Sequence, residues 1–295
     1  MDTKYPILDV PQDSIEDIEQ MGSKRKFWFR LDDARWLFKE PRISSGEHWA
    51  EKIAAELGAL LAIKVARVEL AIFDGLRGSA SLSFAPKNSN LILIHGNEIL
   101  PGTVTGYDKS KRFRQKEHTI PNIRSAIDEM FKEQPGREQA FQSLAGYLLL
   151  DGLIGNTDRH HENWGVILEL MPAAKFHLTV APSFDHASSL GRELTDERKI
   201  RHLKEGTVKD YVEGGRGGIY LTPGDSKGQN PLQLAIQASK ERPELFAGWL
   251  DRIKKLTIPN TTSIIERIPD GWMTTPSKEF ALAALIYAKE RLGGL

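Results

Sequence analysis

Residues 150–165 read LDGLIGNTDRHHENWG and run from an apolar stretch directly into a dense group of polar side chains. The preceding segment, with Phe141, Leu144, Tyr147 and Leu148, is apolar on most sides, so we predict a buried helix there. Because a buried helix ends at a fixed place, the polar loop that follows should be held by the scaffold. We expect the chemistry of the molecule to be centred on this junction.

Two residues of this loop, Asp158 and Asn163, are five positions apart. Phosphoryl transfer uses a carboxylate to accept the proton of the attacking hydroxyl, and a nearby amide to hold a metal ion against the phosphates. About twenty residues later, a second acid, Asp185, ends a strand-like run at 176–180. Two acidic loops that flank a short strand are typical of the metal-binding half of a kinase site. Taken alone, Asp158 and Asn163 would be turn formers, with Arg159 paired to Asp151 or Glu162.

Asp158-Arg159-His160 followed by Asn163, and then Pro182-Ser183-Phe184-Asp185, resemble the catalytic core of the HipA-like serine/threonine kinases and, more distantly, of phosphoinositide kinases. The resemblance extends from about residue 21 to the C-terminus, and its specific part is 150–191. It implies an α+β, two-lobed protein-kinase-like fold with a small β-rich N-lobe containing one helix and a larger helical C-lobe. It also implies ATP and Mg²⁺ as cofactors, Asp158 as the catalytic base, Asn163 and Asp185 as metal ligands, and His160 as a brace of the loop.

Composition excludes several other classes of protein. The 295 residues contain 40 Lys plus Arg and 40 Asp plus Glu, so no overall field attracts nucleic acid or an anionic membrane. The absence of cysteine excludes disulfides and thiolate metal sites, and is compatible with a reducing cytoplasm. No apolar run approaches the ~20 residues of a membrane span, and the N-terminus lacks a secretion signal. We therefore expect no membrane span, no direct nucleic-acid binding, and a cytoplasmic location, or a host cytosol for a delivered effector.

Two aromatic-rich runs, 21–29 and 35–41, flank a turn at 31–34 and predict a β-hairpin. In a kinase, the first turn covers the phosphates with backbone N–H groups, and a strand lysine contacts the phosphate oxygens. We expect Lys39 to be that lysine, although the multi-glycine signature of ordinary protein kinases is absent. The residues expected to cover the nucleotide are Gly22, Ser23 and Lys24.

The segment 46–61 has apolar residues at the helical period and a possible cap at Ser44 or Ser45. Glu47 and Glu51 are four positions apart on one face of this predicted helix, so either could pair with Lys39. The family's exit from helix to strand favours Glu51 as the catalytic partner. The alternative for both glutamates is an ordinary solvated helix face.

The remaining pattern predicts an N-lobe at 1–100, a connection at 101–120 and a helical C-lobe at 121–295. Residues 13–18 are predicted to be helix-like, and 91–96 to be an inner strand that leads to a hinge beside the adenine. The other predicted strands are 65–73 and 77–84, and the predicted C-lobe helices are 123–133, 137–154, 231–240, 243–256 and 277–292.

Three further features have less specific interpretations. The basic run 109–116 is predicted to be a solvated connector, and the glycine-rich run 213–218 to be a loop near the protein-substrate site. A hydrolase metal cluster is disfavoured because adjacent histidines point apart on most backbones. Its candidate ligands would be His160, His161, Glu162 and His186.

The predicted function is an ATP-dependent serine/threonine protein kinase. In the HipA-like family, toxin members phosphorylate proteins of the translation apparatus and are neutralised by an antitoxin, so a protein substrate and an antitoxin partner are implied. Larger members carry an additional N-terminal subdomain, which here would be a separate chain. The alternatives are a lipid or other small-molecule kinase, and a nucleotide-binding module without transfer activity.

Overall fold

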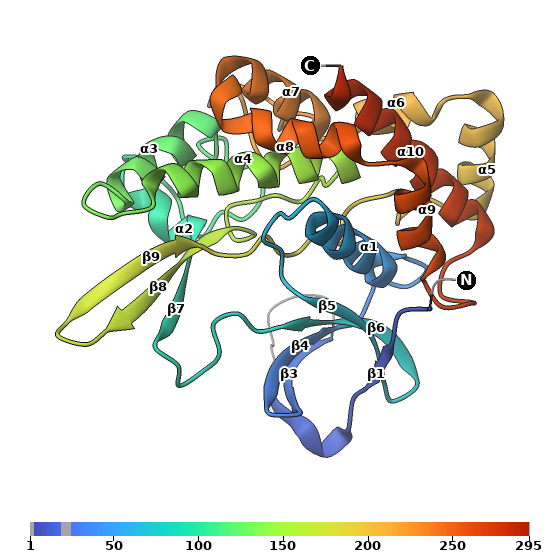
Figure 1. Cartoon of the computed structure of the whole chain (residues 1–295), viewed down its shortest axis with the longest axis horizontal. Helices are drawn as coiled ribbons and strands as arrows, with labels where there is room; N and C mark the ends of the chain where they lie inside the picture. The colour runs from blue at the N-terminus through green and yellow to red at the C-terminus, as the bar shows by residue number, and fades with distance from the viewer. Residues whose placement is uncertain (1–2, 19–24, 295) are drawn as a thin grey trace.

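The computed structural model describes residues 3–18 and 25–294. Figure 1 shows a layer of helices above, a twisted sheet below, and helix α1 between the two layers. A smaller sheet, β7 to β9, projects to one side. This arrangement confirms the predicted α+β fold with a β-rich lobe and a helical lobe. Within the described residues, no helix is long and apolar enough to cross a membrane.

The large sheet has the strand order β1-β5-β6-β4-β3-β2 in the described part of the chain. β1 and β5 are parallel, whereas the other neighbours are antiparallel. The predicted hairpin is β3–β4, and its turn residues Asp32 and Asp33 both have positive φ, as the twist of a two-residue hairpin turn requires. Its strands are β1 Ile7–Asp9, β2 Ile15–Ile18, β3 Lys26–Leu31, β4 Ala34–Lys39, β5 Val68–Phe73 and β6 Leu76–Leu82.

The helix predicted for residues 13–18 is wrong. After one 3₁₀ turn at Gln12–Ser14, the chain extends as β2 and pairs with β3. Ile15 packs against the aromatic core of the sheet, while Glu16 forms ion pairs with Arg30 and Arg35 of the hairpin. The partners of this acidic segment are thus on the neighbouring strands, and no local pattern reveals them.

The two faces of the large sheet bury different cores. Phe27, Phe29, Phe38 and Phe73 form a cluster on one face, with the Phe27 and Phe38 rings stacked at 4.9 Å. Leu70 belongs to the larger core, which is shared by α1 and the helical lobe. The sheet therefore packs against the C-lobe through α1.

Helix α1, Glu47–Leu60, is largely buried and begins without a side-chain cap. Ser44 has a φ of 57° and Gly46 is the N-cap, so the expected serine cap is wrong. A Cβ on Gly46 would lie 2.0 Å from the Trp49 ring, which explains why this position requires glycine. The Gly46 N–H donates to Arg192 O at 2.9 Å, so a loop of the C-lobe holds the start of α1.

Besides α1 and the five predicted C-lobe helices, the described residues form four further helices, α2, α5, α6 and α9. α5 consists mostly of charged residues, and its two strongly apolar residues, Ile200 and Leu203, are three positions apart on one face. α9 contains several β-branched residues and begins at the Thr257 cap. The helices are α2 Gly96–Ile99, α3 Ile120–Met130, α4 Arg137–Ile154, α5 Asp196–Glu205, α6 Val208–Gly214, α7 Pro231–Glu241, α8 Pro243–Lys255, α9 Ile258–Glu266 and α10 Thr275–Gly293.

The smaller sheet consists of β7 Leu91–His95, β8 Gly165–Met171 and β9 Lys175–Val180, in that order. The prediction that 91–96 is an inner strand is wrong, because β7 lies at the edge of this sheet and pairs with β8. A single short strand was expected before Asp185, and the structure instead has the hairpin β8–β9. The end of β7 thereby reaches the predicted catalytic loop, residues 155–164, where the Gly96 N–H donates to Trp164 O at 3.0 Å.

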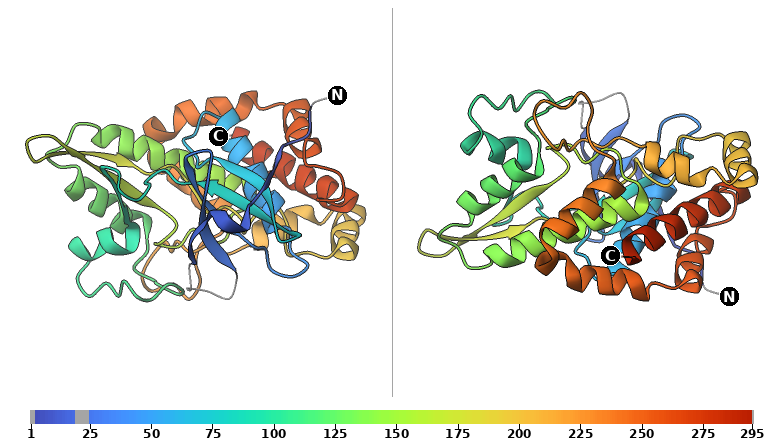
Figure 2. Two further views of the ribbon diagram at one scale, coloured as in Figure 1. Left: turned by 90° about the horizontal axis from the view of Figure 1, so that it is seen from below. Right: turned by 90° about the horizontal axis from the view of Figure 1, so that it is seen from above.

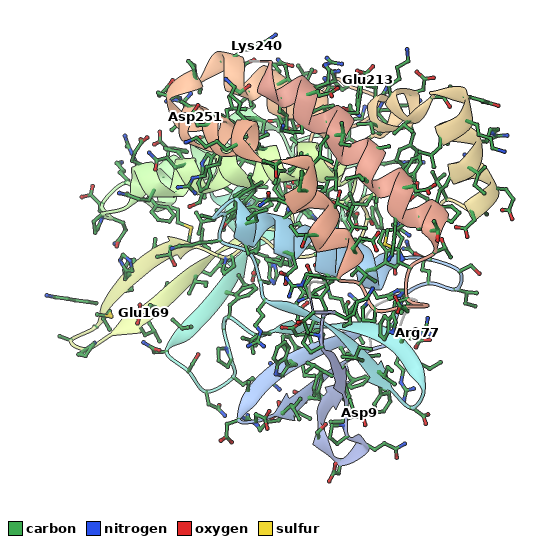
Figure 3. All side chains as sticks on the ribbon, turned by 45° about the vertical axis from the view of Figure 1, so that its right-hand side comes forward. Asp9, Arg77, Glu169, Glu213, Lys240 and Asp251 are labelled. Carbon is green, nitrogen blue, oxygen red and sulfur yellow. The ribbon has the colours of Figure 1, made fainter. Side chains whose placement is uncertain are left out.

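Both ends of the chain lie against the helical lobe. The Tyr5 N–H donates to Arg267 O at 2.8 Å, and Figure 2 shows the N-terminal segment beside α9. Figure 3 shows Arg77 at the tip of β6, next to the loop between α9 and α10. Its guanidinium donates to Gly271 O and lies over the Trp272 ring. These contacts fix the sheet relative to the helices.

Candidate active site

A cleft of about 460 Å³ lies between β4, the start of α1, and the loops that follow α4 and β9. Three of the predicted site residues, Lys39, Asp158 and Asp185, line this one cleft. The cavity of about 390 Å³ behind the loop, against α5 and α6, contains none of the predicted site residues. The topology therefore brings together side chains that are far apart in the sequence, since Lys39 and Asp185 are separated by 146 positions.

Lys39 is the last residue of β4, and its Nζ lies 3.0 Å from Asp185 Oδ1. Burial opposes ionisation of Asp185, but the ammonium groups of Lys39 and Lys26 outweigh it and hold the pKa of Asp185 below its usual range. Asp185 has a φ of 59°, in the left-handed region. The surrounding chain holds it there, because Ser183 exchanges backbone hydrogen bonds with Lys64 and Ala66. Asp185 is thus an ionised carboxylate in a fixed position.

Lys26 is a second cation that the sequence analysis did not assign. It lies directly opposite Lys39 in the β3–β4 register, and both line the cleft. Like charges directly opposite on a sheet repel each other, so this pair is stabilised by an anion. The hairpin register is the signal that could have identified Lys26. Gly22, Ser23 and Lys24, the residues expected to cover the nucleotide, lie outside the described residues.

Glu51 and Glu47 have different environments. Glu51 is 1% exposed, and its Oε1 accepts the His186 N–H at 3.0 Å. Burial raises the pKa of Glu51, while the charge of Lys39 acts in the opposite direction. Glu47 Oε1 instead lies 3.3 Å from Arg42 and 3.1 Å from Arg192. The charges of Lys39 and Asp185 both act on Glu51 through space.

The catalytic loop begins where α4 ends at Gly155, in the left-handed conformation. The Asp158 N–H donates to Asn156 Oδ1 at 3.1 Å, and Asp158 O accepts hydrogen bonds at 2.8 Å from both the Asn163 side chain and the His160 N–H. The Asp158 carboxylate reaches the cleft. Burial, and then the negative charge of Asp185, raise its pKa above the usual range. A raised pKa suits a carboxylate that must accept a proton.

Arg159 holds the loop together, and its pair with Asp151, one of the two partners that the sequence analysis gave as an alternative, is present. Its guanidinium is buried and binds both carboxylate oxygens of Asp151 at 2.7 Å. It also donates to Asn163 O, to Phe184 O at 3.1 Å and to Ser183 Oγ at 2.9 Å. One side chain therefore links the end of α4 to both acidic loops. The planar five-donor geometry of arginine suits this task, and the Asp151–Arg159 spacing was its signal.

The residues present fit the Mg²⁺ that this fold class implies. One Arg159 nitrogen bonds to Asn163 O and Phe184 O, which brings Asn163 and Asp185 close to each other. The Asn163 Nδ2 donates to Asp158 O, and this fixes which face of the amide carries Oδ1. No group of three or more His, Cys, Asp or Glu side chains forms a metal site in the described residues. Mg²⁺ does not need one, because it binds through one or two carboxylates together with substrate phosphates and water.

The loop histidines point to different partners. His160 Nε2 accepts from Arg112 Nε at 3.1 Å and lies 4.0 Å from Asp158 Oδ1. Burial, and then Arg112, lower the pKa of His160 to about 3, so it is neutral. His161 Nδ1 contacts the Tyr107 hydroxyl at 2.8 Å, and His186 Nε2 contacts Ser183 Oγ at 2.7 Å. This arrangement disfavours a hydrolase metal cluster, and it links His160 to the segment before α3.

A scan against protein-family models finds no match for this sequence, and no curated protein matches it. Solved structures do match. The Helicobacter pylori proinflammatory kinase CtkA has a TM-score of 0.74 and 19% identity, over 97% of this chain and 95% of CtkA. HipA of Shewanella oneidensis MR-1, solved with HipB and operator DNA, has a TM-score of 0.57 and 14% identity, over 96% of this chain and 66% of HipA. The chain therefore has the fold of HipA-like kinases, which confirms the resemblance at the level of the fold.

Proposed function

We propose that this chain, which has the fold of HipA-like kinases, is an ATP- and Mg²⁺-dependent kinase that transfers the γ-phosphate to a serine or threonine of a protein. The observation that carries the proposal is the cleft in which Lys39, Asp158 and Asp185 meet. Two carboxylates whose pKa values are shifted in opposite directions share it with two lysines. This combination serves phosphoryl transfer, which depends mainly on positioning and on neutralising charge.

Each residue has a proposed task. Lys39 and Lys26 bind phosphate oxygens, and Glu51 holds Lys39 in place once a nucleotide separates it from Asp185. Asp185 and Asn163 hold Mg²⁺, which neutralises phosphate charge when it is bound. Asp158 accepts the proton of the acceptor hydroxyl, and His160 braces the loop through Arg112.

The proposal extends to organisation and partners. We assign residues 1–100 to the N-lobe, 101–120 to the connection and 121–295 to the C-lobe, with catalysis in a cytoplasmic compartment. The HipA comparison leaves about a third of that chain without a counterpart here. An antitoxin, or a separate chain equivalent to the N-terminal subdomain of larger relatives, is therefore a proposed partner.

The test is transfer of labelled phosphate from ATP by the purified protein to proteins of a cell lysate, followed by identification of the labelled residue. Asp158→Asn retains size and polarity but removes the base, so transfer should fall by about a hundredfold or more. Asp251→Asn, on the outer face of α8 in Figure 3, is the matched control and should transfer like wild type. A wild-type rate for Asp158→Asn would show that Asp158 is only a turn residue.

Calorimetry separates the metal from the base. Titration with ATP, with and without Mg²⁺, should show that Asp185→Asn loses most of the metal-dependent gain in affinity. Asp158→Asn should retain that gain, because Asp158 is not proposed to bind the metal. Equal Mg²⁺ dependence in wild type and Asp185→Asn would contradict the assignment of the metal ligands.

A further inference from the structure

A second cavity, of about 330 Å³, opens on the other side of Asp158. It shares Asp158, Thr157, Arg112 and Phe113 with the first cleft, so the two spaces adjoin at the proposed base. Lys39 and Asp185 line only the first cleft. If the donor phosphates occupy the first cleft, in-line transfer places the acceptor hydroxyl beside Asp158 and away from the metal. This inference rests on the proposed function. The geometry then makes the second cavity the binding site of the phosphate acceptor, here called the acceptor cavity.

The walls of this acceptor cavity are held in place. His118 Nδ1 contacts Gly218 O at 2.9 Å, and the Tyr220 N–H donates to His118 O at 3.0 Å. The segment around 112–118 is thereby joined to the segment around 216–220. A Cβ on Gly218 would lie 2.8 Å from Arg159 O, so glycine lets this second segment approach the catalytic loop closely. The cavity is a formed site between three segments.

The charge of the cavity is strongly one-sided. Its described lining contains three arginines, Arg112, Arg114 and Arg216, and Asp158 is the one acid among these residues. Arg114 is exposed and forms no ion pair within the described part of the chain. Arg216 donates to the carbonyls of Glu213 and Gly215, and therefore keeps its charge without a carboxylate partner. Arg112 has Glu162 at 3.6 Å. Two of the three arginines thus remain available to an anion.

We propose that the acceptor of this kinase is an acidic protein segment, in which carboxylates flank the phosphorylated serine or threonine. Arg114 and Arg216 come from two different segments that line the cavity, so they can meet two negative charges of one acceptor segment. Arginine pairs with carboxylates in a bidentate manner and repels basic sequences, which gives selection in both directions. Phe113, 65% exposed at the rim, offers an apolar contact to the same segment.

A lipid headgroup fits these observations less well. Docking at a bilayer uses a sizeable buried apolar area. Phe113 is the one large apolar side chain among the described lining residues that is strongly exposed. Arginines on two loops, around a recessed base, match an extended chain that passes across the cavity. Residues 112–115 of the basic run 109–116 line this cavity and are therefore part of the proposed acceptor site.

The first experiment measures binding, independently of transfer. Fluorescence anisotropy with the full chain, Mg²⁺ and a non-hydrolysable ATP analogue would compare three labelled peptides that carry one serine flanked by glutamates, glutamines or lysines. The glutamate peptide should bind about tenfold more tightly than the glutamine peptide, and the lysine peptide more weakly than both. The preference should shrink at high salt, because exposed charges are screened. Equal affinities for the three peptides would overturn the proposal.

Variants assign the preference to the arginines. Arg114→Gln and Arg216→Gln should each reduce the ratio between the glutamate and glutamine peptides by roughly three- to fivefold. Arg114→Glu should weaken binding of the glutamate peptide and strengthen binding of the lysine peptide. A protein that was merely misfolded would not show this reversal. Arg201→Gln removes the same charge from the exposed face of α5 and should leave the ratio unchanged. A ratio unchanged in all three cavity variants would also overturn the proposal.

Two further experiments identify the source of the negative charge on the acceptor. They also separate the proposal of an acidic acceptor from the proposal that the protein is a kinase. A peptide with phosphoserines in place of the glutamates supports the anionic site if it binds at least as tightly, and then indicates a previously phosphorylated acceptor. Transfer to phosphoinositide vesicles, with none to any peptide, would overturn an acidic protein acceptor. Transfer to all three peptides at equal kcat/KM would overturn the acidic preference and leave the kinase intact. Selective binding of the glutamate peptide without transfer to any protein would instead contradict the kinase proposal.

Discussion

Asp158 and Asp185 are chemically identical carboxylates in one cleft, and their surroundings shift their pKa values in opposite directions. Asp185 lies beside Lys39, which keeps it ionised despite its burial. The pKa of Asp158 is raised first by burial and then by the negative charge of Asp185 itself. Such a pair is typical of a site that divides its tasks, because one group remains an anion while the other exchanges protons. The metal-ligand and base roles proposed for them follow this division.

Glu51 is buried, and burial raises its pKa, so its charge destabilises the folded protein. Glu51→Gln keeps an oxygen that can accept the His186 N–H. We expect the free energy of unfolding to stay within about 1 kcal/mol of wild type, because the lost charge was not a favourable one. Transfer should nevertheless fall roughly tenfold or more, since Lys39 loses the carboxylate that holds it among the phosphates.

Urea denaturation and the KM for ATP measure the two effects separately. Glu279→Gln, on the exposed face of α10, is the control for the loss of one glutamate charge and should alter neither quantity. An unchanged KM and kcat in Glu51→Gln would mean that Lys39 does not depend on this helix.

At the scale of elements, the catalytic loop is positioned by three supports. Helix α4 ends beneath it, the β8–β9 hairpin connects its end to Asp185, and Arg159 joins these parts through hydrogen bonds to Asp151, Ser183 and Phe184. The fourth neighbour is the glycine-containing segment after α6, which contacts the loop at Gly218. These contacts join the loop to α4, to the chain after β9 and to the segment after α6, so a shift in any of these parts moves the site.

Gly218→Ala tests the last of these supports. The new Cβ would lie 2.8 Å from Arg159 O and 3.0 Å from the Arg159 carbonyl carbon, so the segment must move away from the catalytic loop. We expect KM for the protein acceptor to rise several-fold, while the affinity for ATP and Mg²⁺ changes little. Gly214→Ala, four residues earlier, has no atom within 4 Å of its new Cβ and is the matched control. Equal acceptor KM values for the two variants would exclude this segment from the acceptor site.

At the scale of the whole molecule, buried histidines make the fold sensitive to acid. Burial lowers the pKa of His48 to about 4, and that of His118 and His160 to about 3, from the usual 6.5. Because the unfolded chain binds these protons first, the folded state loses stability as the pH falls below 6.5. Each group costs about 1.4 kcal/mol at one pH unit below that value. The raised pKa values of Glu51 and Asp158 act in the opposite sense.

We therefore expect the free energy of unfolding to fall by roughly 4 kcal/mol between pH 7.5 and 5.5, from these three histidines together. His118→Gln retains a donor for Gly218 O and an acceptor for the Trp164 indole, but it cannot bind a proton. The His118→Gln substitution should reduce that fall by about 1 kcal/mol. His177→Gln, on the β8–β9 hairpin, is the control and should leave the fall unchanged. Chemical denaturation at the two pH values measures the difference. A fall of equal size in wild type and His118→Gln would remove His118 from the explanation.

The sequence by itself determined those parts of the molecule whose signals are local. The hairpin β3–β4, helix α1 and the long helix α4 were predicted, because alternation and helical periodicity are properties of consecutive residues. Spacing also singled out Asp158 and Asp185, and the structure places both in one cleft. Their catalytic roles remain predictions.

Only the tertiary structure decided which distant groups meet. The partner of β7 is β8, about seventy residues later, and the short acidic segment of β2 extends because its partners are on the neighbouring hairpin. The raised pKa of Glu51, and the opposite pKa shifts of Asp158 and Asp185, depend on burial and on charges from other elements. Strand pairing, desolvation and Coulomb interactions act through space, so a pattern of neighbouring residues does not contain them.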